Sequence, residues 1–332
     1  MVLAMAMMAV APAATAGAQS TYRVVELGTA PGFNATTGDD INASGQVAGT
    51  LHGGVLGEKR SAFVWDPSSG LRALGDFAGR GTVGGGINDR GVVTGAAPSG
   101  HVYFGQTAFR WTAAGGFEDL GPAGDPSGIN NAGEVIGTAL GPAWVRWDAG
   151  GQVQPFGSLP YIYGSPRAIN DDGQIVGYAP ERGAQLWDPQ TGLGQLPPFP
   201  GGSFALAYDI NDVGHASGNA GVPYVTKLKR GMSAPCGLRA NSCAVIWRDG
   251  RPTAVGPNGS FGNGINDQDD VVGQFLDGSN AYRAFLSRDG VFDDLNQLVP
   301  AGTPFLEAAQ AINDAGWILA NTRGRAFVLI PR

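Results

Sequence analysis

One phrase recurs seven times along this chain, and its recurrence restricts the fold more than any other feature. GINDRGVVTG at residues 86–95 returns with variations as DINASGQVAG, GINNAGEVIG, AINDDGQIVG, DINDVGHASG, GINDQDDVVG and AINDAGWILA. Spacings of 46, 42, 40, 41, 55 and 47 residues separate the asparagines of the phrase: Asn42, Asn88, Asn130, Asn170, Asn211, Asn266 and Asn313. A repeat of this length is typical of solenoids and propellers.

Two further landmarks follow the phrase, one after all seven copies and the other after six, and together they predict four strands per unit. An apolar run such as SAFVW (residues 61–65) predicts a third strand, and a segment ending in Leu-Gly, such as LRALG (71–75), predicts a fourth. The 55 glycines and 22 prolines among 332 residues also favour short strands joined by many turns.

The last unit lacks its fourth strand, whereas YRVVELG (residues 22–28) precedes the first phrase without a unit of its own. A linear solenoid gives no reason to divide one unit between the two chain ends, but a ring is closed by such a division. We therefore predict an all-β fold. It is a seven-bladed β-propeller with four-stranded antiparallel blades, in which the N-terminal strand completes the last blade.

The turn within the phrase has its own chemistry. The asparagine side chain is expected to cap its own turn, and the glycine of N-x-x-G is expected in the left-handed conformation of a bulged hairpin. The sixth unit carries Asp269 at the glycine position, and aspartate tolerates a positive φ better than most residues.

The N-terminal residues 1–18 resemble a cleaved export signal, because an apolar run precedes Ala-x-Ala sites that would be cut after Ala16 or Ala18. The basic flank of such signals is missing, so either the signal is atypical or the true start codon lies elsewhere. We predict one domain over residues 19–332, secreted or periplasmic, without a membrane-inserted segment.

The two cysteines, Cys236 and Cys243, lie in the longest insert (residues 219–245). In an exported protein such a pair predicts a disulfide rather than a metal site, because the insert offers no histidine or acidic ligand. We expect no metal and no cofactor. The net charge of −7 disfavours binding to nucleic acid, and we expect a monomer.

The repeat resembles the extracellular proteins named for a His-Ala-Phe (HAF) motif, and the resemblance covers residues 22–330. The Ala-Phe pair is kept in SAFVW, TAFRW, RAFLS and RAFVL, but the histidine is replaced by Ser61, Thr107, Arg283 and Arg325. The resemblance implies an exported repeat protein without an assigned activity.

In a propeller, the turns of the phrase occupy one face and the non-repetitive loops the other, and irregular loops on a rigid scaffold favour binding. The leading hypothesis is a secreted, non-catalytic binding protein with a glycan or envelope partner. The candidate ligand-binding residues are His52, Arg60, Tyr161, Tyr163, Phe199, Phe204, Tyr208, Tyr224 and Phe261. The alternative for the aromatic residues is that they pack the loops onto the blades.

Two other functions stay open. The first is a carbohydrate-active enzyme, either a polysaccharide lyase using His101, Tyr103 and Arg167 or a glycosidase using loop carboxylates. Glycosidase chemistry needs two carboxylates about 5–9 Å apart, and the acidic candidates are Asp39, Asp40, Asp76, Asp125 and Glu307. The second is a structural surface protein without a small ligand.

Overall fold

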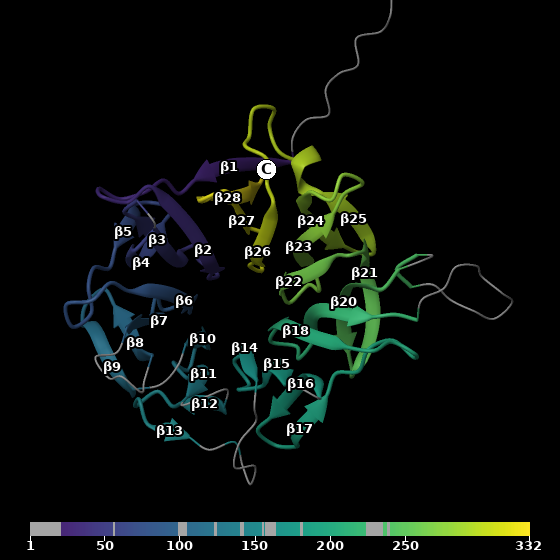
Figure 1. Ribbon diagram of the computed structural model, residues 1–332, viewed down its shortest axis with the longest axis horizontal. Helices are drawn as coiled ribbons and strands as arrows, with labels where there is room; N and C mark the ends of the chain where they lie inside the picture. Colours follow the sequence, from purple (N-terminus) through teal and green to yellow (C-terminus); the bar gives the residue numbers. More distant parts are fainter. Residues whose placement is uncertain are drawn as a thin grey trace, which may run out of the picture.

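The protein is a ring of seven four-stranded antiparallel sheets, which confirms the predicted propeller (Figure 1). The computed structural model describes residues 21–55, 57–98, 105–122, 125–139, 143–154, 156, 164–179, 182–223, 235–237 and 240–332. The predicted signal at residues 1–18 lies outside this part. None of the described helices is long and apolar enough to cross a bilayer.

Each blade places one strand at the ring centre and the next three successively outward. Blade 1 consists of β2 (Ala35–Ile41), β3 (Val47–Gly53), β4 (Lys59–Asp66) and β5 (Gly70–Ala73). Blade 2 consists of β6 (Val83–Ile87), β7 (Val93–Pro98), β8 (Gln106–Thr112) and β9 (Gly116–Pro122). Blade 3 consists of β10 (Pro126–Ile129), β11 (Val135–Ala139), β12 (Ala143–Trp147) and β13 (Val153–Gln154). Every inner strand therefore ends at the isoleucine that precedes the repeated asparagine.

The remaining blades repeat this order. Blade 4 consists of β14 (Ser165–Ile169), β15 (Ile175–Ala179), β16 (Gly183–Asp188) and β17 (Gly192–Gln195), and blade 5 of β18 (Ala205–Ile210), β19 (Ala216–Gly221), β20 (Ser242–Arg248) and β21 (Arg251–Asn258). Blade 6 consists of β22 (Phe261–Ile265), β23 (Val271–Leu276), β24 (Tyr282–Arg288) and β25 (Val291–Asp294). Blade 7 consists of β26 (Ala308–Ile312), β27 (Ile318–Thr322), β28 (Arg325–Pro331) and β1 (Tyr22–Glu26). A single 3-10 turn, η1 (Leu295–Gln297), follows β25 among the described residues.

The N-terminal strand closes the ring as predicted. β1 pairs antiparallel with β28, from Tyr22 opposite Pro331 to Glu26 opposite Phe327, and the two lie side by side in Figure 1. Tyr22 and Leu27 are almost fully buried. The carboxylate of Glu26 pairs with Arg325 at 2.5 Å.

The apolar core lies between neighbouring blades. One cluster joins Ala48 and Ala62 of blade 1 to Phe109 and Trp111 of blade 2, and equivalent clusters follow around the ring. The tryptophan of the third strand also reaches the preceding blade, as when the indole N–H of Trp147 donates to the carbonyl of Leu120 at 3.0 Å. The two apolar landmarks of each repeat thus pack blade against blade.

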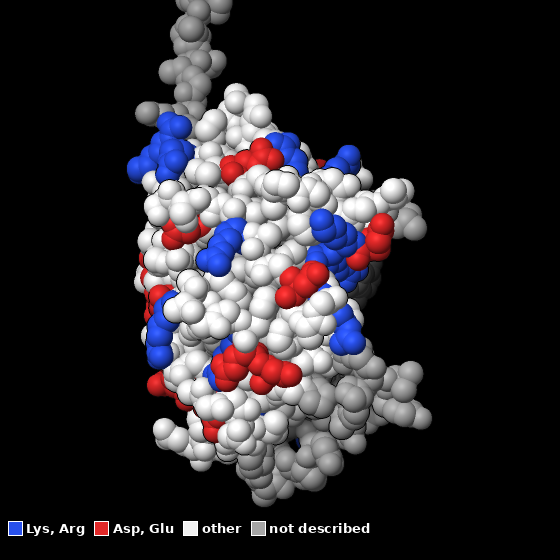
Figure 2. Space-filling model, turned by 90° about the vertical axis from the view of Figure 1, so that its left-hand side faces the viewer, with Lys and Arg blue, Asp and Glu red and all other residues white. Residues whose placement is uncertain are grey.

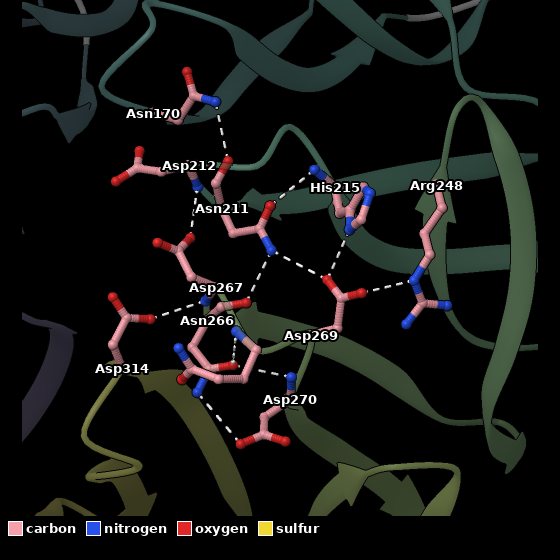
Figure 3. A network of polar contacts seen from close by, with 11 residues as sticks. Asn170, Asn211, Asp212, His215, Arg248, Asn266, Asp267, Asp269, Asp270 and Asp314 are labelled. Carbon is pink, nitrogen blue, oxygen red and sulfur yellow. Dashed lines mark hydrogen bonds and ion pairs between the residues drawn. The ribbon is translucent and has the colours of Figure 1, made fainter.

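The repeated asparagines form a closed ring of hydrogen bonds, part of which is visible in Figure 3. Each side-chain amide N–H donates to the backbone carbonyl of the asparagine in the next blade at 2.9–3.2 Å, and Asn313 completes the circle by donating to Asn42. Each side-chain oxygen accepts the backbone N–H four residues later, at 2.8–3.0 Å. The predicted turn cap is confirmed, and the same side chain also joins the blades.

The left-handed turn position is confirmed as well. The glycines of the phrase have φ between 72° and 87°, and Asp269 takes their place with φ 64°. The exception to the glycine pattern therefore keeps the geometry of the turn.

A second ring of bonds lies beside the first. The backbone N–H that follows each ring asparagine donates to the side chain at the same position in the next blade, at 2.7–2.9 Å, beginning with Ala43 to Asp89. These side chains are Asp89, Asn131, Asp171, Asp212, Asp267 and Asp314. Blade 1 carries Ala43, which offers no acceptor, so the described residues show six such bonds.

Candidate functional site

Every inner strand contains a β-bulge three residues before its ring asparagine. The pairing register shifts between Gly38 and Asp40 in blade 1, and equivalent shifts occur in the other six inner strands. The bulged positions are Asp39, Gly85, Ser127, Arg167, Tyr208, Asn263 and Gln310, which we call the bulge ring. Bulges re-aim side chains, and here all seven positions line one central cavity.

This cavity is the central channel, with a volume of about 570 Å³ and a lining drawn from all seven blades. Ligand pockets in proteins are commonly about 300–1,000 Å³. The ring isoleucines bound it toward the turn face, where a smaller hollow of about 170 Å³ shares Ile129 and Ile169 with it. The bulge ring lies on the side of the isoleucines that faces the variable loops.

Two channel carboxylates brace the inner strands. Asp40 accepts the backbone N–H groups of Ile41 at 2.8 Å and Ile87 at 2.9 Å. Asp209 accepts the N–H groups of Ile210 and Ile265, both at 2.9 Å. Each carboxylate therefore links its own strand to the next blade.

Burial raises the pKa of both groups, to about 6 for Asp40 and about 7 for Asp209, although their backbone bonds act in the opposite direction.

Asp39 faces the hollow of the channel, so its accessible surface lies inside the molecule. Enclosure by the surrounding protein raises the pKa of Asp39 to about 8, and the neighbouring carboxylate of Asp40 adds to the rise, while the hydroxyl of Thr50 opposes it. At neutral pH this carboxyl is mainly protonated and can donate a hydrogen bond.

Arg167 and Tyr208 form a pair in adjacent blades. The guanidinium of Arg167 lies 5.9 Å from the centre of the Tyr208 ring, within the range of cation–π contacts. Burial raises the pKa of Tyr208, against the opposing charge of Arg167, so its hydroxyl stays protonated at neutral pH.

Three polar side chains, those of Ser127, Asn263 and Gln310, complete the ring together with Gly85. The amide N–H of Asn263 donates to the carbonyl of Ala309 at 2.9 Å, which fixes the orientation of its side chain. The hydroxyl oxygen of Ser127 is buried without a hydrogen-bond partner among the described residues. A buried polar atom of this kind is uncommon, and it offers a bonding position to a ligand in the channel.

The structure moves several predicted site residues from loops to strands. Arg167, Tyr208 and Phe261 were assigned to loops but lie on the inner strands β14, β18 and β22. His52 and Arg60 lie opposite each other on β3 and β4. The bulges let strand pairing continue through segments whose sequence does not alternate, which explains the difference.

Of these predicted residues, Arg167 and Tyr208 line the channel together and the others do not. His52 bonds Thr37 at 3.2 Å, and burial together with the charge of Arg60 lowers its pKa. Phe199 is buried in the cluster around Trp247, as the packing alternative predicts, whereas Phe204 is 39% exposed. The structure does not describe His101, Tyr103, Tyr161, Tyr163 or Tyr224.

The predicted disulfide is present between Cys236 and Cys243, in the connection from β19 to β20. Among the acidic candidates, Asp39, Asp40 and Asp125 line the channel. Glu307 pairs with Arg323 in a separate hollow that is lined by blades 6, 7 and 1. No cluster of three or more His, Cys, Asp or Glu side chains in the described ranges has the geometry to hold a metal ion.

The acidic sixth turn is occupied by ion pairs. Asp269 contacts His215 at 2.8 Å and Arg248 at 2.7 Å (Figure 3). Asp270 contacts Arg288 at 2.7 Å. The contacts of Asp269 therefore join blades 5 and 6, whereas the pair of Asp270 and Arg288 lies within blade 6. On the rim shown in Figure 2, basic and acidic side chains are interspersed and form no broad basic patch.

Sequence reasoning missed the bulge ring as a set, although a signal was present. When the repeats are aligned on the asparagine, the residue three places earlier is Asp, Gly, Ser, Arg, Tyr, Asn and Gln in turn. The residue directly before the asparagine is isoleucine in every copy. The variable position lies two residues before an invariant isoleucine. Such variation indicates side chains that do not take part in packing the blades together.

Comparisons with known proteins support the fold. No family model matches the sequence, and no curated protein is significantly similar to it. A chain in a crystal structure of the mitotic checkpoint complex is similar at a TM-score of 0.55 and 15% identity, covering 99% of this chain and 98% of that one. YCF48 bound to D1 peptide is similar at a TM-score of 0.53 and 11% identity, covering 95% and 97%. Identities this low support a shared propeller fold alone.

Proposed function

We propose that this protein is an exported, non-catalytic binding protein whose ligand, a sugar unit of a glycan, enters the central channel from the variable-loop face and contacts the bulge ring. The observation that carries the proposal is chemical variety at one structural position. Seven equivalent bulges present a carboxyl, a guanidinium, a phenol, a hydroxyl, two amides and one glycine to a single cavity. A position that served the scaffold alone would repeat, as the neighbouring isoleucine does.

The chemistry of the ring suits a hydroxyl-rich ligand. Carboxyl, amide and hydroxyl groups exchange hydrogen bonds with sugar hydroxyls, and the face of Tyr208 offers an aromatic surface to a sugar ring. Gly85, Gly86 and Gly128 leave room on one side of the channel. Because the ring stands on paired strands rather than on loops, its side chains are held in place before a ligand arrives.

Two features support export. Disulfides persist mainly in oxidising compartments, and the Cys236–Cys243 bond is formed. The repeat phrase supports membership of the extracellular HAF repeat proteins. A glycan of the cell envelope, free or carried by an envelope protein, is then the partner that we propose.

A glycan array, followed by titration of each hit, tests the proposal. We expect wild type to bind at least one glycan and Ser127→Trp, which fills the channel, to abolish that binding. The loop variant Phe204→Ala serves as the matched control and should bind as wild type does. If no glycan binds, or if the channel variant binds normally while folded, the proposal is wrong, and the structural surface protein is then favoured.

The rival function, a carbohydrate-active enzyme, has one observation in its favour. Asp39 is a mainly protonated carboxyl beside the more acidic Asp40 in a cavity, and a pair of carboxyl groups with separated pKa values is typical of glycosidases. Incubation of each bound glycan with the protein distinguishes the two functions. Release of reducing ends, or of unsaturated products, that is lost in Asp39→Asn would establish the enzyme.

A further inference from the structure

The bulge ring places its arginine and its carboxyl group on opposite sides of the channel. Asp39 stands in blade 1, and Arg167 and Tyr208 stand in blades 4 and 5, which are the blades farthest from blade 1 in a ring of seven (Figure 1). The amides of Asn263 and Gln310 occupy one arc between them, and Gly85 and Ser127 occupy the other. A ligand that contacts the bulge ring therefore meets a cation and an aromatic ring on one side and a carboxyl on the other. The carboxyl groups of Asp125 and Asp209 line the channel as well, in blades 3 and 5.

Among the described residues, Arg167 is the arginine that lines the channel, and it is not neutralised by an acidic side chain. By contrast, six described arginines elsewhere in the molecule contact a carboxylate at 2.5–3.1 Å: Arg110, Arg248, Arg283, Arg288, Arg323 and Arg325. In the described part of the chain, Arg167 makes no ion pair and its side chain makes no hydrogen bond, and its recorded contact is the face of Tyr208. Its five N–H donors are thus available to a ligand.

The channel carboxylates are not positioned to occupy that guanidinium. The oxygens of Asp40 and Asp209 are bonded to four backbone N–H groups from blades 1, 2, 5 and 6. Asp39 bonds the Thr50 hydroxyl across the ring from Arg167. The fourth channel carboxyl, that of Asp125, makes no hydrogen bond or ion pair among the described residues. Most of the acidic side chains in the channel are therefore already engaged, while its arginine is not.

Resting on the proposed function, we propose that the glycan presents an acidic sugar unit, whose anionic group is held by Arg167. The sugar ring then lies against Tyr208, and its hydroxyls reach the amides of Asn263 and Gln310 and the hydroxyl of Ser127. A carboxylate fits the planar fork of a guanidinium through two parallel bonds, and a sulfate ester offers the same charge without that planarity.

Calorimetric titration with four trisaccharides of matched backbone tests this inference: a uronate, a sulfated neutral sugar, an unmodified neutral sugar and an amino sugar. We expect an anionic trisaccharide to bind wild type about tenfold or more tighter than the neutral one. In Arg167→Gln its affinity should fall by about 10- to 100-fold, as expected when bonds to a charged group are lost, and the affinity for the neutral sugar should stay the same. Arg167→Lys, which keeps the charge without the fork, should restore uronate binding in part.

Arg182→Gln is the matched control, because it removes the same charge from an exposed position of blade 4 outside the channel lining. Tighter binding of the uronate identifies a carboxylate ligand, and tighter binding of the sulfated sugar identifies a sulfate. Equal or tighter binding of the neutral or amino sugar overturns the inference but leaves the proposed function standing, and so does an equal effect of Arg182→Gln. Absence of binding by all glycans overturns the proposed function itself.

Discussion

At the scale of single residues, the side chain of each ring asparagine makes two hydrogen bonds with different roles. Its side-chain oxygen accepts a hydrogen bond within its own turn, and its side-chain N–H donates a hydrogen bond to the next blade. The position therefore needs a short, buried side chain that carries both an acceptor and a donor. The sequence predicted the first role because that bond is local. The second role joins residues 40–55 positions apart in six of the bonds and 271 positions apart in the bond from Asn313 to Asn42, and only the closed ring brings them together.

Replacing one ring asparagine should destabilise the whole protein. In Asn170→Ala, the carbonyl of Asn211 and the N–H of Gln174 lose their buried partners. We expect the free energy of unfolding in urea to fall by about 2–4 kcal/mol. Asp172→Ala, an exposed change in the same turn whose side chain makes no hydrogen bond among the described residues, should alter it by less than about 1 kcal/mol. Equal effects of the two variants would show that the amide ring contributes nothing.

The channel aspartates should make stability depend on pH. The folded pKa values of Asp40, Asp209 and Asp39 are raised from 3.8 to about 6, 7 and 8, so the folded state holds these protons more tightly than the unfolded chain. Their contribution to stability is complete below about pH 4 and is lost as the pH rises through the folded values. We expect the melting temperature to decline between about pH 4 and pH 8.

Asp39→Asn should remove the upper part of that decline, above about pH 7. Asp277→Asn is the control, because hydrogen bonds from Ser279 lower the pKa of Asp277 to about 2, outside the interval measured. A melting temperature that is flat or rises over this interval in wild type would contradict the assigned ionisation of the channel.

At the scale of elements, most strands were predictable and the bulges were not. Apolar runs such as SAFVW and the N-x-x-G turns specify strands and hairpins locally, and the unmatched YRVVELG segment specified the closing strand. A bulge depends on how two strands register against each other, and the sequence before the isoleucine shows no alternation. For that reason Arg167 and Tyr208 were placed in loops, and their meeting across two blades was not predicted.

Removal of the closing strand tests ring closure. Deleting residues 21–28 removes the buried Tyr22 and Leu27, each worth about 1.5–3 kcal/mol, and leaves β28 as an unpaired edge. We expect the melting temperature to fall by about 10 °C or more. A synthetic peptide of residues 21–28 should restore it with increasing concentration, and a peptide of the same composition in scrambled order should not. Unchanged melting after the deletion would contradict closure by β1.

The disulfide in the connection between β19 and β20 should contribute modestly. Closing so short a loop restricts the unfolded chain by about 2.5 kcal/mol in the chain-entropy treatment. The double variant Cys236→Ser, Cys243→Ser should lose about that much in urea denaturation, and reduction of wild type should reproduce the loss. A variant as stable as oxidised wild type would show that the bond contributes nothing to folding.

At the scale of the whole molecule, the repeat builds a ring and the departures from the repeat build its site. The sequence pointed to the variable-loop face as the place of function. The structure adds a deeper location on the same axis, where strand bulges release one residue per blade into the channel. The sequence named Asp39 as an acidic candidate, Arg167 as a lyase candidate and Tyr208 as an aromatic binding candidate. In the structure all three occupy the same bulge position of their blades and line one channel.

A crystal structure of the protein with the tightest glycan from the array tests the central claim most directly. We predict that a sugar unit occupies the channel, with hydrogen bonds to at least three bulge-ring side chains and an anionic group on Arg167. A sugar bound to the aromatic residues of the loops, with the channel unoccupied, would contradict the claim that the bulge ring is the binding site.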